Sequence, residues 1–340
     1  MKKKLFIGID FSKEKFDATL LDGVQGLNLA HSEFPNDSKG FVLFYKWISK
    51  HSKVNKTEWL ICGENTGVYS RKLSFYMLQK GCFMWLENPL QIKRSMGLVR
   101  GKTDKADSLR ISEYAMRYQD KALLLKKPDK EIDDLKNLMS FRDRLVKAKK
   151  LLQVPSEELR RVENRDTTTR FIRDCSNTEV SKIEKKIQLV EERILEIKDS
   201  QEDIATNYEL VTSVKGVGMI TAISLIIYTD NFLRFQEARQ LACYCGCAPF
   251  PYSSGTMSAP NRVSHLANRA LKTLLTQCAH SAKSHDETMR AYYLKKIAEG
   301  KEKNVVINNI RNKLIHWIWA IVQNKQPYQK NYKTNWANIA

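Results

Sequence analysis

Short apolar runs and amphipathic segments alternate along the first 120 residues of the chain. Apolar runs at 4–10, 15–22 and 27–34 predict three consecutive strands that form a meander. Two further strands are predicted at 58–63 and 82–87. Strands that first follow one another and then alternate with helices indicate an α/β layer fold with a mixed sheet.

The segments between and after these strands have helical periodicity. Asn36 or Asp37 can cap the first predicted helix. The predicted helices run from that cap to about Lys50, over 69–80, from Pro89 onward and over 104–118.

A different pattern begins after residue 120. Residues 128–160 and 176–206 are long, charged and helical by period, with a basic loop at 160–173 between them. Apolar residues recur at helical spacing in the second segment, at Ile183, Ile187, Val190, Ile194 and Ile197. This pattern is typical of a coiled-coil-like connector or oligomerisation arm, and equally of a helix packed on its own domain.

The last part of the chain is predicted to be a mainly α domain. A Pro-, Ser- and Gly-containing segment at 248–261 predicts a loop. Helices are predicted at about 263–283, 286–298 and 303–323. Trp317 and Trp319 are expected to pack in the core, with base stacking as the alternative. We expect four segments: an α/β domain at 1–120, a helical connector at 121–207, a mainly α domain at 208–325 and a tail at 326–340.

The chain is strongly basic, with 57 Lys and Arg against 38 Asp and Glu and a net charge of +19. Nucleic-acid phosphates and anionic membrane surfaces both attract such a chain. Its basic residues are spread over the whole length, which favours an extended nucleic-acid footprint. No stretch approaches the ~20 apolar residues of a transmembrane helix, and the apolar run after the N-terminal lysines is too short for a signal peptide. We expect a cytoplasmic protein without a membrane partner.

Seven cysteines are present, and an odd number in such a chain argues against a disulfide framework. Cys243, Cys245 and Cys247 form a C-x-C-x-C run inside an apolar stretch. Zinc sites normally use C-x2-4-C pairs with a second pair or histidines further on. Small buried thiols are therefore the preferred interpretation.

Four acidic residues stand at positions that suit metal chemistry. Asp10 ends the first predicted strand, and Glu64 ends a later strand that is expected beside it, at the sheet edge where functional sites gather. Asp104 and Asp107 are three residues apart, which places both on one face of a helix start. Converging carboxylates repel unless divalent cations lie among them, and oxygen ligands suit Mg²⁺ or Mn²⁺. The alternative is that each is an ordinary strand-end residue or helix cap.

Three motifs in this order resemble the DEDD transposases of bacterial insertion sequences, a family that includes the Piv/MooV DNA invertases. The motifs are Lys-Leu-Phe-Ile-Gly-Ile-Asp at 4–10, Gly-Glu-Asn-Thr-Gly at 63–67 and Lys-Thr-Asp-Lys-Ala-Asp at 102–107. The resemblance covers nearly the whole chain and implies a RuvC-like, RNase-H-fold nuclease domain at the N-terminus. It also implies an acidic tetrad that binds Mg²⁺ or Mn²⁺, here Asp10, Glu64, Asp104 and Asp107. Asn65 is a mild departure from the usual Glu-(small)-Thr-Gly motif.

The first strand is also similar to that of sugar kinases and actin-like ATPases. Those proteins need glycine-rich phosphate loops. The chain has 14 glycines, and none cluster after Asp10, which disfavours this alternative.

Residues 211–222 have the form of a helix-hairpin-helix motif. Such a hairpin exposes backbone N–H groups at a helix N-terminus, which can hold a phosphate. Lys215, Gly216 and Gly218 are the residues expected to contact nucleic acid there. A glycine-containing turn between two packed helices is the alternative.

Gly246-Cys247-Ala248-Pro249, leading to Ser254-Gly255, resembles the C-terminal transposase domain of the same family. The resemblance implies that Ser254 attacks DNA and forms a covalent phosphoserine link, with Ser253 as a neighbouring candidate. Two serines before a glycine otherwise indicate a turn. This segment has fewer basic residues than the family pattern. Further nucleic-acid contacts are expected from Lys102, Lys105, Arg262 and Arg269.

The resemblance therefore implies a transposase that exchanges strands between donor and target DNA. It also implies a structured bridge RNA as guide, a homo-oligomer (dimer or tetramer) and a place in the bacterial nucleoid. Two other functions are open: a RuvC-like, structure-specific (Holliday-junction) endonuclease without serine chemistry, and a non-catalytic nucleic-acid-binding protein.

Overall fold

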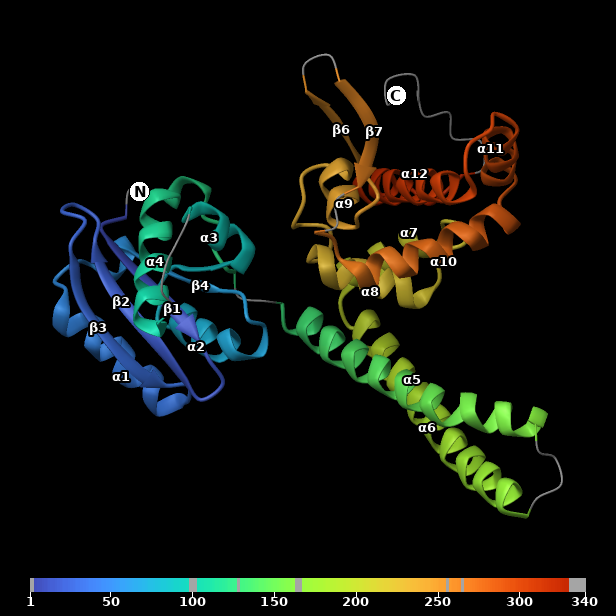
Figure 1. The fold of residues 1–340 in the computed structure, drawn as a ribbon, viewed down its shortest axis with the longest axis horizontal. Helices are drawn as coiled ribbons and strands as arrows, with labels where there is room; N and C mark the ends of the chain where they lie inside the picture. The colour runs from blue at the N-terminus through green and yellow to red at the C-terminus, as the bar shows by residue number, and fades with distance from the viewer. Residues whose placement is uncertain are drawn as a thin grey trace. The chain divides into compact units, whose positions relative to one another are not determined.

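The computed structural model describes residues 3–97, 103–126, 129–162, 167–254, 257–263 and 266–329. The chain forms two compact units, residues 1–127 and 128–340 (Figure 1). The helices of the predicted connector belong to the second unit, and the finer division into four segments stays a prediction.

The N-terminal unit is built on a five-stranded mixed sheet with the strand order β3-β2-β1-β4-β5 (Figure 1). Its strands are β1 (Leu5–Phe11), β2 (Lys15–Asp22), β3 (Asn28–Pro35), β4 (Trp59–Glu64) and β5 (Met84–Glu87). The first three form the predicted antiparallel meander, and β4 and β5 extend the sheet in parallel with β1. The strand that ends in Glu64 therefore lies beside the strand of Asp10, as predicted.

Helices cover both faces of this sheet. They are α1 (Ser38–His51), α2 (Val68–Gln79), α3 (Pro89–Ser95) and α4 (Asp104–Arg117), with single 3-10 turns at Lys56–Glu58 and Gln119–Lys121. One face carries alternate β1 residues such as Ile7 and packs against α1 and α2. The opposite face carries Phe6, Leu60 and Trp85 and packs against Ile111 of α4. The second of these apolar layers thus holds α4 on the face that also carries Asp10.

Gly8 lets α4 approach the middle of the sheet closely. A Cβ atom at this position would lie 2.0 Å from the Ser108 carbonyl oxygen and 2.3 Å from the Ser112 nitrogen. The hydroxyls of Thr19 on β2 and Ser108 on α4 share a buried hydrogen bond of 2.7 Å. These contacts fix the first turns of α4 over β1 and β2.

The C-terminal unit is mainly helical. Its helices are α5 (Lys130–Val162), α6 (Thr167–Asp199), α7 (Glu202–Thr212), α8 (Met219–Thr229), α9 (Ala238–Tyr244), α10 (Arg269–His285), α11 (Glu287–Ala298) and α12 (Lys303–Asn324). One core joins them, with fully buried residues such as Ala222, Leu275 and Ile310. Trp317 and Trp319 pack against this core, as predicted. No helix in the described part of the chain is long and apolar enough to cross a membrane.

The long helices α5 and α6 lie side by side (Figure 1). Val190, Ile194 and Ile197 of the predicted apolar stripe are buried in the same core as Ile132 and Leu135 of α5. This end of the stripe therefore packs on its own unit, which is the second of the two predicted alternatives. A role of the helices in oligomerisation stays a prediction.

Strands β6 (Pro249–Ser254) and β7 (Met257–Val263) form a two-stranded antiparallel sheet. The prediction of a loop over 248–261 was therefore wrong. Proline is tolerated at the first residue of a strand, on strands with a free edge and at bulges. Pro249 begins β6, and the register shifts between Phe250 and Tyr252, at Pro251.

Candidate functional site

Each strand of the N-terminal sheet contributes one acidic residue to a single row that crosses all five strands. The acidic row consists of Glu33 (β3), Asp17 (β2), Asp10 (β1), Glu64 (β4) and Glu87 (β5). The β1–β4 pairing reaches Ile9 opposite Gly63, so Asp10 and Glu64 are the next positions on their strands. Residues opposite one another in a sheet point to the same face. That face is the one covered by α4.

The first turn of α4 adds two carboxylates near this row. Asp104 is the first residue of the helix, and Asp107 lies in the same turn. The helix cap is Thr103, whose hydroxyl accepts a hydrogen bond of 3.2 Å from the Ala106 N–H. Because Thr103 already caps this helix, capping does not account for the acidic residue at Asp104. Asp107 accepts a hydrogen bond of 2.7 Å from Arg110 Nη1.

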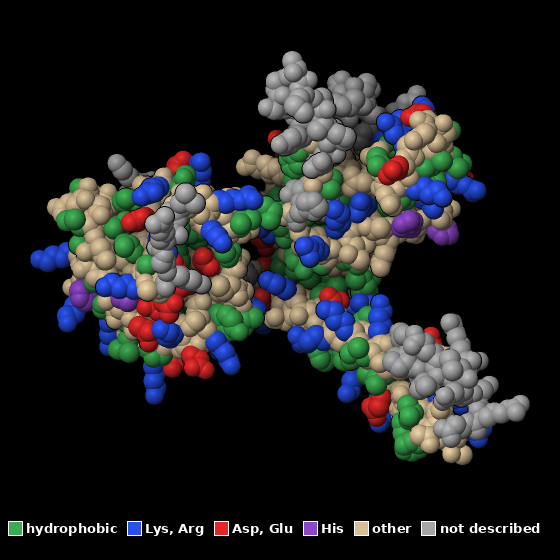
Figure 2. All heavy atoms as spheres, viewed as in Figure 1, with side chains coloured by type: hydrophobic (Ala, Val, Ile, Leu, Met, Phe, Trp, Pro, Cys, Tyr) green, Lys and Arg blue, Asp and Glu red, His purple; other side chains and the backbone are tan. Residues whose placement is uncertain are grey.

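Four of these acidic neighbours act on the carboxyl group of Asp10. Burial raises its pKa, and the negative charges of Glu64, Asp107, Asp104 and Asp17 raise it further, to about 6. All four predicted acids therefore lie close enough to interact electrostatically. Carboxyl groups in such like-charged surroundings are typical of functional sites. Figure 2 shows acidic side chains gathered on the viewer's side of the N-terminal unit.

The donor chemistry of the acidic row and of α4 fits Mg²⁺ or Mn²⁺, because every candidate donor is a carboxylate oxygen. The buried hydroxyl of Thr66, two residues after Glu64, also has no hydrogen-bond partner among the described residues. However, no three Asp, Glu, His or Cys side chains of the described ranges are gathered closely enough to hold a metal ion. The atoms that suit a divalent cation are present near one another, but they do not surround a common point.

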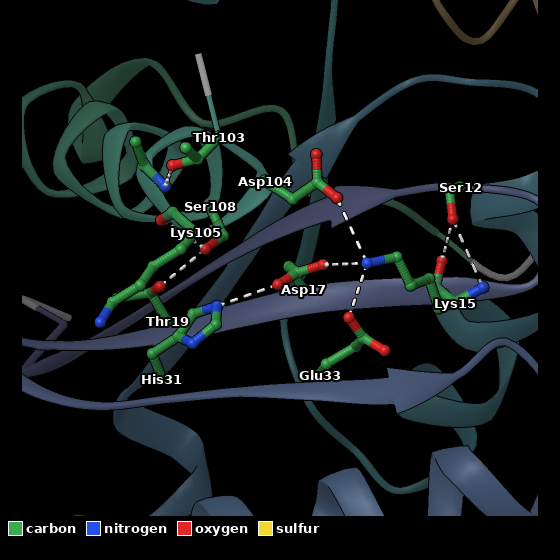
Figure 3. Close-up of polar contacts among 11 residues, drawn as sticks. Ser12, Lys15, Asp17, Thr19, His31, Glu33, Thr103, Asp104, Lys105 and Ser108 are labelled. Carbon is green, nitrogen blue, oxygen red and sulfur yellow. Dashed lines mark hydrogen bonds and ion pairs between the residues drawn. The ribbon is translucent and has the colours of Figure 1, made fainter. Parts of the chain in front are cut away.

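Basic side chains of the same unit already contact the acidic row (Figure 3). The Nζ atom of Lys15 lies 2.6 Å from Glu33, 3.3 Å from Asp104 and 3.6 Å from Asp17. The Nε2 atom of His31 lies 3.0 Å from Asp17. In the half of the row on β2 and β3, the Lys15 ammonium group thus compensates the carboxylates, and His31 makes a hydrogen bond to Asp17.

Sequence reasoning did not identify Asp17, Glu33, Glu87 or Lys15. Asp17 stands between apolar residues of β2, and a charge inside such a strand was the one available signal. The other acids are ordinary in their local sequence. Only the strand register aligns them with Asp10.

Ser254 is the last residue of β6 and pairs with Met257 at the end of the hairpin (Figure 1). Ser253 precedes it, and Arg262 pairs with Phe250. The side chains of Ser253, Ser254 and Arg262 lie outside the described part of the structure, as does Lys102 altogether. The hairpin and the acidic row belong to different units.

Lys215, Gly216 and Gly218 lie in the turn between α7 and α8, where a helical hairpin was predicted. Gly216 has a φ of +93°, and a Cβ atom there would lie 2.7 Å from the backbone nitrogen of Ala282. Gly218 caps α8 without a side-chain hydrogen bond, and no atom lies within 4 Å of where its Cβ would be. An exposed helix N-terminus beside the exposed Lys215 is an arrangement that suits a phosphate.

A groove of about 1220 Å³ adjoins this turn. Gly216 and Gly218 form part of its wall, and α5 contributes Lys136, Arg144 and Lys147. The lining also includes Arg142, Asp143 and Glu191, so basic side chains outnumber acidic ones in this groove. Of the remaining predicted contacts, Arg269 is the exposed first residue of α10, and Lys105 is exposed on α4.

The cysteine run is mostly buried. Cys245 and Cys247 are inaccessible, and Cys243 is half-buried. Burial raises the pKa of the Cys245 thiol and raises that of Cys247 to about 11. The prediction of buried thiols is confirmed for these two residues.

Comparison with known proteins extends these observations. Residues 7–154 match the family DEDD_Tnp_IS110, described as transposase, and residues 208–294 match the transposase IS116/IS110/IS902 family. The chain is 25% identical over 332 residues to the pilin gene-inverting protein of Moraxella lacunata, covering 96% of this chain and 98% of that protein. It is 26% identical over 255 residues to the transposase for insertion sequence element IS1111A of Coxiella burnetii, covering 67% and 68%.

Proposed function

The chain belongs to the IS116/IS110/IS902 family of transposases, and we propose that it moves an insertion sequence by cutting and rejoining DNA strands with two sets of residues. The first set is the acidic tetrad of the N-terminal unit. The second is Ser254 at the end of the β6–β7 hairpin. The observation that carries the proposal is the position of Asp104 and Asp107 at the start of α4, over the sheet face that bears Asp10 and Glu64.

For the first set, we propose that Asp10, Glu64, Asp104 and Asp107 hold Mg²⁺ or Mn²⁺ in a RuvC-like, RNase-H-type domain. A bound divalent ion stabilises negative charge on a phosphodiester and lowers the pKa of a coordinated nucleophile. The raised pKa of Asp10 supports this assignment, because the fold holds like charges together at a cost that a cation relieves. The mixed sheet with helices on both faces supports the fold assignment.

For the second set, we propose that Ser254 is the nucleophile of strand transfer. A bond forms between its Oγ atom and phosphorus while a P–O bond of the DNA backbone breaks. The serine hydroxyl gives up its proton and the departing oxygen takes one up, so one strand end is released as a hydroxyl and the other stays linked to the protein. The placement of Ser254 at the end of a hairpin supports the proposal, because a terminal position can reach a backbone phosphate. Ser253 is the adjacent alternative.

Nucleic-acid binding is proposed for both units, with donor and target DNA and a structured guide RNA as partners. The net charge of +19 supports this, as does the basic groove beside Gly216 and Gly218.

Like charges also lie close together on the C-terminal unit. Burial and the charge of Lys296 lower the pKa of Lys313, and burial with Arg239 and Lys313 lowers that of His316. The guide RNA and a dimeric or tetrameric assembly follow from the family resemblance.

The test is to trap the covalent intermediate. Purified full-length protein is incubated with Mg²⁺ and labelled DNA that carries the ends of its own element, and denatured protein is then examined for attached label. We expect an adduct whose modified residue maps to Ser254 by mass spectrometry. The Asp10→Asn variant should lose at least about 100-fold in adduct yield while still binding DNA.

Two variants separate the alternatives. Ser254→Ala should abolish the adduct, whereas Ser253→Ala should retain it. A Ser254→Ala protein that cuts DNA at the wild-type rate would instead indicate a structure-specific endonuclease without serine chemistry. An Asp10→Asn protein with unchanged recombination would overturn the proposed role of the acidic tetrad. A wild-type protein that binds DNA but neither cuts it nor becomes linked to it would leave nucleic-acid binding as the function.

A further inference from the structure

The amino group of Lys15 lies among three carboxylates that come from three different elements. Its Nζ atom is 2.6 Å from Glu33 on β3, 3.6 Å from Asp17 on its own strand β2, and 3.3 Å from Asp104 on α4 (Figure 3). The Lys15 side chain is 40% exposed, so solvent and ions can reach the group. A single ammonium group therefore ties the start of α4 to the outer strands of the sheet.

These contacts determine where Asp104 points. Asp17 and Glu33 lie one and two strands away from Asp10 on the β2–β3 side, whereas Glu64 lies on the opposite side, on β4. The Lys15 contact therefore holds the Asp104 carboxylate on the side away from Glu64. Among the described residues, no three acids converge closely enough for a metal ion. The Lys15 contact gives a physical reason why Asp104 does not converge with Asp10 and Glu64.

We propose that Lys15 is a tethered cation that occupies the acidic row in the metal-free protein and holds Asp104 there until a divalent ion displaces it. Lys15 is thus a positioning residue for the metal site, and this inference rests on the proposed function. Displacement breaks the Lys15–Asp104 contact and leaves Lys15 with Glu33 and Asp17, both outside the tetrad. Asp104 is then able to turn toward Asp10 as a ligand. The ammonium group and the metal ion are therefore competitors for one carboxylate.

An ordinary surface ion pair is the simpler interpretation of the same contacts. Such pairs contribute little to stability, because solvent screens them. The two interpretations differ in what happens to metal affinity. A structural pair that braces Asp104 predicts weaker metal binding when Lys15 is removed, whereas a competitor predicts tighter binding.

The experiment measures Mn²⁺ binding to the full-length protein by isothermal titration calorimetry, without DNA. We expect Lys15→Met to bind Mn²⁺ roughly threefold to tenfold more tightly than wild type, which corresponds to the loss of one competing ion-pair contact. Lys15→Arg should stay within about twofold of wild type, because it keeps the charge. Lys13→Met is the matched control, since Lys13 is an exposed lysine two residues earlier, in the bend before β2, and it should not change the affinity.

The outcomes separate this inference from the proposed function. If wild type binds Mn²⁺ and Lys15→Met binds with equal or lower affinity, the competitor role is wrong and the metal site stands. If wild type binds no Mn²⁺, both the metal half of the proposed function and this inference are overturned.

Thermal unfolding gives a second readout. Lys15→Met should unfold at a lower temperature than wild type in chelator, and Mn²⁺ should raise its unfolding temperature by more than it raises that of wild type. An equal Mn²⁺ shift in both proteins would overturn the proposal. Lys15→Gln, which keeps a polar end group without the charge, serves the same tests if Lys15→Met does not fold.

Discussion

Asp10 of β1 and Asp17 of β2 lie directly opposite one another in an antiparallel pair, on the same face of the sheet. Like charges in this relationship destabilise a sheet. The charge of Asp17 is compensated by Lys15, and its carboxylate also contacts His31, whereas the pKa of Asp10 is raised to about 6. Like-charge repulsion in the N-terminal unit is therefore left unrelieved at Asp10, which is a metal ligand in the proposed mechanism.

The first prediction concerns the stability cost of Asp10. Its folded-state pKa of about 6 is above the usual ~3.9, so ionisation opposes folding as pH rises through this window. In chelator at pH 7, Asp10→Asn should raise the free energy of unfolding by about 1 kcal/mol, after allowance for partial exposure. Near pH ~4 the variant should have the same free energy of unfolding as wild type, because Asp10 is protonated in the folded protein. Urea unfolding at the two pH values measures this.

The control for this prediction is Asp120→Asn, which removes an exposed carboxylate of the same unit. It should leave the stability unchanged at both pH values. An Asp10→Asn protein that is no more stable than wild type at pH 7 would show that the neighbouring acids do not act on Asp10 as described.

The second prediction concerns Gly8. Because a methyl group there would meet the backbone of Ser108 and Ser112, α4 must move away from the sheet. We expect Gly8→Ala to lose about 2–3 kcal/mol of unfolding free energy and to weaken Mn²⁺ binding, since α4 carries Asp104 and Asp107. Gly218→Ala adds the same group where no atom lies within 4 Å, and it should change stability by less than about 1 kcal/mol.

The third prediction concerns the turn between α7 and α8. If Lys215 neutralises a phosphate, Lys215→Ala should weaken DNA or RNA binding and lower the slope of log affinity against log salt by about 1. Fluorescence anisotropy over a salt series measures this slope. Lys301→Ala removes an exposed lysine from the turn after α11 of the same unit and should leave the slope unchanged. Identical slopes for both variants would show that the turn between α7 and α8 does not contact nucleic-acid phosphates.

The fourth prediction tests the cysteine run. Cys175 is exposed, whereas Cys245 and Cys247 are buried with raised pKa values. Because the thiolate is the reactive form, iodoacetamide at pH 7.5 should label Cys175 at least about 100-fold faster than these two residues. Peptide mass spectrometry over time gives the rates. Rapid labelling of Cys247 only after a zinc chelator is added would favour the metal interpretation instead.

Most of the N-terminal fold was predictable because its patterns are local. The strand that ends at Asp10 and the helix that begins at Asp104 follow from apolar runs and from a helix start signal. The hairpin at Ser254 was not predicted, because its prolines indicate a loop unless the strand edge they occupy is known to be free. Lys15 and Glu33 were missed for another reason: their role depends on strand register, which no local pattern contains.

The acidic row has a consequence for the identity of the fold itself. Side chains alternate between the two faces of each strand, so a slip of one residue in any strand would turn its acid toward the α1–α2 side. There Asp10 or Asp17 would lie among the buried residues Ile7 and Phe44, where an unpaired charge is very costly. The same charges that destabilise the native sheet therefore destabilise every shifted strand pairing much more. The carboxylates proposed for catalysis also help to ensure that the strands assemble in only one alignment.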